Sequence, residues 1–168
     1  MQKLDTKRVT MAGLIAAIYT ATSLVTFPVA SGAIQFRVSE ALCLLPLLLP
    51  ECVIALTAGC VLSNLITGCA ILDVVFGSVV TLIAAILTRA VGTLIKSTAL
   101  KLFVGGIFPV ALNAFILPLI WLWCYGAFEY MYYLQVIFLL VSQSVAVYGL
   151  GVPLFIGVRK IVQKKQNV

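Results

Sequence analysis

The chain has 168 residues and a net charge of +6, and 63% of its residues are hydrophobic while only 10% are charged. A soluble domain has about 25% charged residues, and a short chain leaves much of its surface exposed, so this composition excludes an ordinary soluble protein. The chain contains no histidine, which removes the commonest metal ligand and general base. We therefore expect a membrane protein that is not an enzyme and that uses no metal or other cofactor.

Uncharged runs long enough to cross a membrane follow one another along the chain. A membrane-spanning helix needs about 20 mostly apolar residues. Runs that reach this length without a charge cover residues 9–36, 52–72, 102–128 and 130–158. The sequence therefore predicts an all-α, polytopic integral membrane protein in which residues 1–168 form a single transmembrane domain.

Two further apolar runs are shorter than a membrane-spanning helix. The run 74–88 is flanked by Asp73 and Arg89, which can serve as its interfacial ends. The run 41–50 would rise only about 15 Å as an α-helix, roughly half of the hydrocarbon core. To serve as a span it must begin near Phe36 and keep the charges that follow inside the protein.

The basic residues predict the number of spans. All 11 Lys and Arg residues except Arg37 lie in three clusters, at 3–8, 89–101 and 159–165. Cytoplasmic segments collect Lys and Arg, so the three clusters share one side only if an even number of spans separates them. Six transmembrane helices satisfy this rule, with four before the middle cluster and two after it. We expect cytoplasmic N- and C-termini and no nucleic-acid binding, because these residues flank apolar spans and do not line one soluble face.

Polar side chains recur on or near the predicted outer halves of the spans, where a charge needs a partner or a purpose. They are Gln35, Arg37, Glu40, Asn64, Asp73, Asn113 and Gln143. A single buried amide commonly joins helices, but several amides and acids at one depth predict a cup for a small polar molecule. Two structural alternatives remain: Arg37 and Glu40 are spaced to pair with each other on a helix, and Asp73 is placed to cap one.

Aromatic residues cluster near an outer boundary at Trp121, Trp123 and Tyr125. They are typical of the belt that anchors spans at the membrane surface. The alternative is that one of them stacks on a flat ring of the bound molecule. We favour Trp121 for this role, because it lies farther from the loop and therefore deeper.

Small residues recur at helical spacing in the first run. Ala12 and Ala16 form one row, and Gly13, Ala17 and Ala21 form the next. Such rows allow helices to pack closely, either within the chain or against a separate membrane protein. No phosphate-binding loop of the G-x-x-x-x-G-K-[ST] type is present, so any ATP hydrolysis would belong to a partner.

Several of these residues belong to longer motifs. They are the stretch Gly-Ala-Ile-Gln-Phe-Arg-Val-Ser-Glu-Ala-Leu at 32–42 followed by Leu45-Pro46, the pairs Gly59-Cys60 and Asn64-Leu65, and Leu-Asp-Val-Val-Phe-Gly-Ser at 72–78. Together they resemble the QueT family. The resemblance covers nearly the whole chain and is strongest in its first half.

That family consists of substrate-binding S components of energy-coupling factor (ECF) transporters. The resemblance implies six helices, an outward-facing site and a queuosine precursor as cargo, a 7-deazaguanine such as preQ1, preQ0 or queuine. It also implies a bacterial plasma-membrane location, and as partners a transmembrane coupling subunit and two cytoplasmic ATPases, with docking through Ala12 and Ala16. The alternatives are a stand-alone channel or facilitator, or an S component for another small vitamin or nucleobase. An acid is usual for the family near the middle of the last span, where this chain has Ser142-Gln143.

Overall fold

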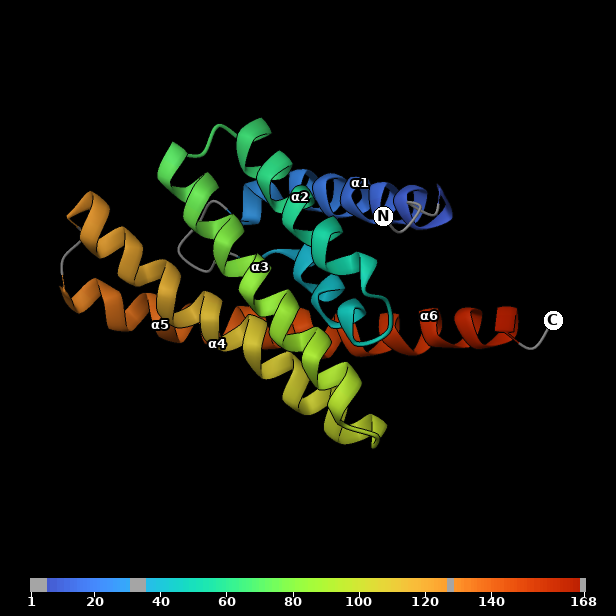
Figure 1. Cartoon of the computed structure of the whole chain (residues 1–168). Coiled ribbons are helices and arrows are strands. Elements are labelled where there is room, and N and C mark those ends of the chain that lie inside the picture. The colour runs from blue at the N-terminus through green and yellow to red at the C-terminus, as the bar shows by residue number, and fades with distance from the viewer. Residues whose placement is uncertain (1–5, 31–35, 127–128, 167–168) are drawn as a thin grey trace.

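The computed structural model describes residues 6–30, 36–126 and 129–166, and within these ranges all regular structure is helical (Figure 1). The elements in chain order are α1 (Thr6–Ala30), η1 (Val38–Leu47), α2 (Glu51–Ile66), α3 (Ile71–Leu94), α4 (Thr98–Tyr125), α5 (Glu129–Ser144), η2 (Val145–Leu150) and α6 (Gly151–Gln166). The last three are continuous, with η2 as a π-helical stretch between two α-helical ones. The all-α prediction is confirmed for the described residues.

Four helical stretches are long and apolar enough to cross a membrane. They cover Thr6–Pro28, Ile71–Leu94, Thr98–Cys124 and Tyr132–Lys164. The chain is therefore a multi-pass membrane protein. The other two, η1 and α2, have 10 and 16 residues. Even α2 rises only about 24 Å against a hydrocarbon core of about 30 Å, so six complete spans remain a prediction.

The short run at 74–88 extends further than its charges suggested. Helix α3 continues past Arg89 to Leu94, so this basic residue lies within the helix and not in the connection after it. The Arg89 Nη1 donates a hydrogen bond to the Pro46 carbonyl at the end of η1, at 3.3 Å. The helix can hold the charge because its guanidinium finds a backbone acceptor inside the protein.

The element η1 lies at the centre of the bundle and contacts α1, α2, α3, α4, η2 and α6. Residues 39–47 are all buried, as expected of a segment that is apolar all round. This segment is a 3₁₀ helix, which rises about 2.0 Å per residue, so its ten residues cover about 20 Å and not the 15 Å of an α-helix. As predicted, its acid Glu40 stays inside the protein.

Two glycines permit the close approaches that position the site. A Cβ on Gly59 would lie 2.8 Å from the Cβ of Tyr19, so only glycine allows α2 to pack against this ring of α1. A Cβ on Gly151 would lie 2.8 Å from the Ala41 carbonyl oxygen, where α6 meets η1. Real side chains do not approach this closely without a shift of the backbone.

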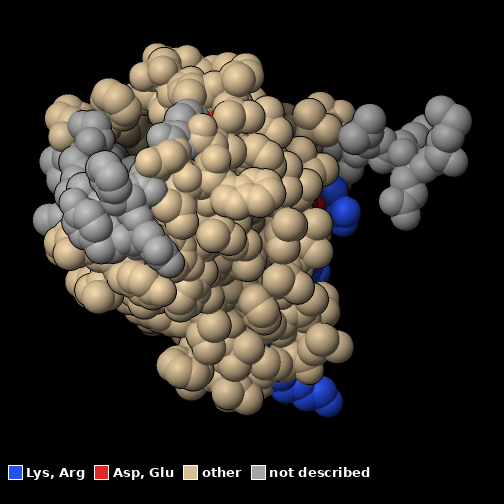
Figure 2. All heavy atoms as spheres, turned by 90° about the vertical axis from the view of Figure 1, so that its left-hand side faces the viewer, with Lys and Arg blue, Asp and Glu red and all other residues tan. Residues whose placement is uncertain are grey.

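The first turn of α1 and the last turn of α6 lie at one end of the bundle, on the right of Figure 1. The α2–α3 connection, the end of α4 and the start of α5 lie at the left. Viewed from the left-hand end, the surface shows Lys and Arg only at its margin (Figure 2). At the terminal end, Arg8 forms an ion pair with Glu51 at 3.2 Å, and Arg159 donates to the Thr98 hydroxyl at 2.9 Å. This arrangement agrees with an even number of crossings; that the basic end faces the cytoplasm remains a prediction.

Candidate binding site

Glu40 is the central polar residue of the interior. It is 3% exposed, and its carboxylate accepts hydrogen bonds from three side chains on separate parts of the fold. The Tyr19 hydroxyl donates to Oε1 at 3.2 Å, while the Asn113 Nδ2 and the Cys43 thiol donate to Oε2 at 3.3 and 3.1 Å. A buried carboxylate needs such donors because it has lost its water. The predicted site residues Glu40 and Asn113 are thus in direct contact.

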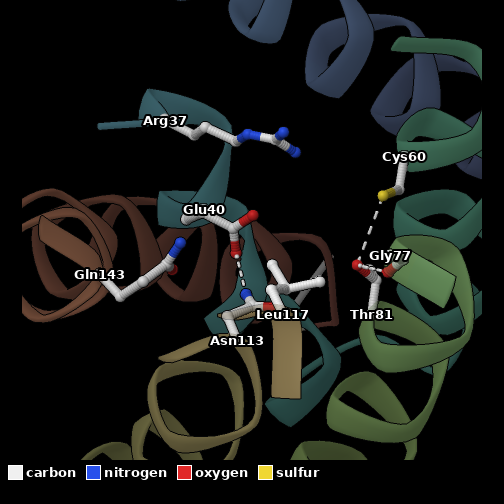
Figure 3. Close-up of a pocket in the computed structure, with 8 residues that line it drawn as sticks. All are labelled: Arg37, Glu40, Cys60, Gly77, Thr81, Asn113, Leu117 and Gln143. Carbon is white, nitrogen blue, oxygen red and sulfur yellow. Dashed lines mark hydrogen bonds between the residues drawn. The ribbon is translucent and has the colours of Figure 1, made fainter. Parts of the chain in front are cut away.

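Glu40 lines a small inner hollow, drawn in Figure 3. Its other lining residues are Arg37, Cys60, Gly77, Thr81, Asn113, Leu117 and Gln143. The hollow measures about 10 Å³, roughly the space that one water needs. It brings together four of the predicted site residues: Arg37, which directly precedes η1, and Glu40, Asn113 and Gln143 on η1, α4 and α5.

A larger outer hollow, of about 120 Å³, lies next to it. It is lined by Arg37, Asn64, Cys69, Asp73, Gly77, Leu117 and Trp121. The Trp121 Nε1 donates to the Asp73 Oδ1 at 2.9 Å, whereas Trp123 is 90% exposed on the outside. Of the two tryptophans, Trp121 is therefore the one that borders the interior. The residue that precedes α3 at its N-terminus is Ala70, so Asp73 lies within the first turn and is not the cap.

Arg37 borders both of these hollows and one more. It lines the inner hollow, the outer hollow and a third small hollow bounded by Ser23, Phe27, Ser63, Asn64 and Thr67. In Figure 3 its guanidinium extends between Glu40 and Cys60. No ion pair joins Arg37 to Glu40, so of the two alternatives left open for these described residues, the direct pair does not form.

Several residues of the site were not predicted from the sequence. Cys60 accepts hydrogen bonds from the Thr81 hydroxyl at 3.4 Å and from the Asn64 Nδ2 at 3.6 Å, which orients both side chains at the edge of the hollows. Tyr19 bonds Glu40. Its position near the middle of α1 was the available signal, because tyrosines in membrane helices usually lie at the interface.

The remaining predicted residues are distributed as follows. Gln35 lies outside the described residues. Gln143 is buried and borders the inner hollow. On α1, Ala16 is buried and Ala12 half-buried against the core, whereas the neighbouring row Gly13, Ala17 and Ala21 is exposed. The burial of the first row favours packing within the chain for Ala12 and Ala16.

Acidic and sulfur-containing side chains are not clustered as metal ligands here: within the described ranges no three His, Cys, Asp or Glu residues are grouped to hold an ion. What the site offers is hydrogen-bond acceptors, one guanidinium and one aromatic face. Such a set can hold a small planar polar molecule by its edges and its face.

Comparison with known proteins gives one match. No curated protein and no solved structure matches the chain. The model of one family, described as QueT transporter, matches residues 9–160 and so covers most of the chain. This is the family that the motifs at 32–42 and 72–78 resemble, and it is a family of transporters and not of enzymes. The chain, a multi-pass membrane protein with a polar hollow among its helices, belongs to the QueT transporter family.

Proposed function

We propose that the chain is the substrate-binding S component of an ECF-type importer and that its cargo is a queuosine precursor, a 7-deazaguanine. The observation that carries this proposal is the pair of hollows beside Arg37, one bordered by the Glu40 network and the other by Trp121 and Asp73. A 7-deazaguanine has a flat ring and an edge of N–H donors. Carboxylates accept strongly from such an edge, and an indole can stack on the ring.

The size of the hollows supports a role for Arg37 in loading. The outer hollow, at about 120 Å³, has room for only a few waters and is smaller than a bicyclic base. Arg37, Gly77 and Leu117 border both this hollow and the inner one. Movement of the Arg37 side chain would join the two spaces, so the cargo would reach Glu40 as the guanidinium moves aside.

The interior beyond Glu40 favours a carrier over a channel. Leu44, Leu47, Val147 and Phe155 are buried there in one apolar cluster. A stand-alone channel would need a polar path through this region. A carrier binds its cargo at one end and releases it after a movement relative to its partners. For this family these are a transmembrane coupling subunit and two cytoplasmic ATPases, at the bacterial plasma membrane.

The first test concerns the cargo. The purified protein should bind 7-cyano-7-deazaguanine, 7-aminomethyl-7-deazaguanine or queuine in isothermal titration. Glu40→Gln and Asp73→Asn should each weaken binding by more than about tenfold, or 1.4 kcal/mol, because each removes a charged acceptor. Glu51→Gln is the matched control, since this acid lies at the opposite end and pairs with Arg8. Unchanged affinity in both variants would refute the proposal that these two carboxylates accept from the N–H edge of the cargo. Binding of a different vitamin or nucleobase would show that the chain is an S component for that molecule.

The second test concerns the partner. The exposed row Gly13, Ala17 and Ala21 offers the small-residue surface on α1 that docking requires. Ala17→Trp should abolish co-purification with the coupling subunit while leaving cargo binding intact. Ile86→Trp, at an exposed position on α3, is the control. A complex that survives Ala17→Trp would move the docking face elsewhere, and cargo uptake in cells without the coupling subunit would favour a facilitator.

A further inference from the structure

Gln143 is a buried side chain with an unused acceptor. It lies on α5, is 3% exposed and lines the inner hollow together with Glu40 and Asn113. Its carboxamide oxygen Oε1 has no hydrogen-bond partner among the described residues. In Figure 3, Gln143 and Asn113 approach Glu40 from different helices. A buried acceptor without a donor is unfavourable, so this oxygen is available to accept a hydrogen bond from a bound molecule.

The Glu40 carboxylate, in contrast, is nearly saturated. Each carboxylate oxygen has about two acceptor sites. Oε2 already accepts from Asn113 and Cys43, and Oε1 accepts from Tyr19. One acceptor site therefore remains, on Oε1. A cargo that presents two N–H groups cannot place both on Glu40 without displacing a protein donor.

The surroundings of Gln143 limit its freedom to find a partner within the protein. The neighbouring Ser142 is also buried, and its hydroxyl donates to the Leu139 carbonyl. Two residues further on, the helix widens into the π-helical stretch η2, which packs against η1. Such π-helical insertions often accompany functional sites. The stretch that follows Gln143 closely in the chain thus packs against the element that carries Glu40.

We infer that Glu40 and Gln143 read one donor edge of the cargo between them. The ring N–H would bond Glu40 Oε1. The adjacent exocyclic amine would bond the Gln143 Oε1 after a turn of the carboxamide that brings this oxygen, buried in the cargo-free structure, toward the hollow. The inference rests on the proposed function and deepens it, because it specifies a heterocycle with an amine next to a ring N–H. In this arrangement the two N–H groups of the cargo do not both bond one carboxylate. One bonds Glu40 on η1 and the other bonds Gln143 on α5.

The test is a cycle of two ligands and two proteins. 7-Deazaguanine and 7-deazahypoxanthine differ only in the exocyclic amine. The wild-type protein should bind the first more tightly by about tenfold or more, and in Gln143→Met this preference should fall to within about threefold, because the acceptor for the amine is gone. Ser142→Ala, at the buried neighbour, is the matched control and should keep the wild-type preference.

A second measurement is independent of cargo. In the cargo-free state, Gln143→Met should keep or raise the melting temperature, because it removes a buried acceptor that lacks a donor. A clear fall would show that the carboxamide is bonded within the protein and would overturn the inference.

The two hypotheses fail in different ways. If queuosine precursors bind but the preference for the amine is the same in wild type and Gln143→Met, the shared edge is wrong and the proposed function stands. If the precursors bind and 7-deazaguanine without a 7-substituent does not, the shared edge is also wrong and the proposed function also stands. If no 7-deazaguanine binds the folded wild-type protein, the proposed function is wrong, and the inference falls with it.

Discussion

Arg37 is a charged residue whose position, at the junction of three hollows, matters more than any single contact it makes. Its side chain borders all three, and no ion pair joins it to the nearby Glu40. A guanidinium on a long flexible stem has several rotamers open to it, whereas the Glu40 carboxylate is held by three donors. The site thus combines a carboxylate held by three donors with a guanidinium that no ion pair joins to it.

Removal of the Arg37 side chain should open the inner hollow. Cys60 lines this hollow and is buried, so in the wild-type protein it should react slowly with N-ethylmaleimide. In Arg37→Ala we expect several-fold faster modification of Cys60. Peptide mass spectrometry measures the extent of modification over time. Cys52 is the internal control, because it is buried on the same helix and lines none of the three hollows that Arg37 borders. Equal acceleration at both cysteines would indicate general loosening and would contradict the expected opening of the inner hollow.

At the scale of elements, η1 organises the molecule. A 3₁₀ helix of this length is uncommon, because its hydrogen bonds are poorer than those of an α-helix. Here it is enclosed by other helices, so packing on all sides compensates. Its contacts with α6 are close enough that only glycine fits at Gly151. The same packing sets the depth of Glu40 within the bundle.

The contact between η1 and α6 can be tested with a matched pair of substitutions. Gly151→Ala should destabilise the protein by about 1–3 kcal/mol, because the new methyl group would lie 2.8 Å from the Ala41 carbonyl oxygen. Gly157→Ala, on the same helix with open space around it, should be neutral or stabilising by up to about 1 kcal/mol through higher helix propensity. Thermal unfolding in detergent measures both. Equal effects would show that the approach of α6 to η1 is not tight.

At the scale of the whole molecule, charge is distributed unevenly along the bundle axis. The first turn of α1, the last turn of α6 and the α3–α4 connection lie at one end. Asp73, at the start of α3, and Trp121, near the end of α4, both border the outer hollow and lie away from that end. The positive-inside rule predicts that the basic end faces the cytoplasm. The hollows would then open toward the outside, as an importer requires.

Cysteine labelling in whole cells tests this orientation. In a background with Cys69→Ser and Cys124→Ser, Ala70→Cys at the α2–α3 connection should react with a membrane-impermeant maleimide in intact cells. Ser97→Cys at the α3–α4 connection should react only after permeabilisation. Both positions are exposed, so accessibility within the protein does not differ. The opposite pattern would invert the topology and place the hollows on the cytoplasmic side.

The sequence by itself determined the class of the protein, the apolar helices and the choice of polar residues for the site. These follow from composition, run length and charge, because each residue's cost in lipid is set by its own chemistry. Thus Glu40, Asn113, Asp73 and Trp121 were named in advance, and the structure brings them to adjoining hollows.

Only the tertiary structure decided which of these residues meet. It joined Glu40 to Tyr19 and Asn113 and not to Arg37, bonded Trp121 to Asp73, and left the Gln143 oxygen without a donor. It also turned the Ala12 and Ala16 row inward and carried α3 past Arg89. The physical reason is that these contacts depend on helix rotation and depth, which arise from side-chain packing between segments far apart in the chain. Local pattern does not encode that packing.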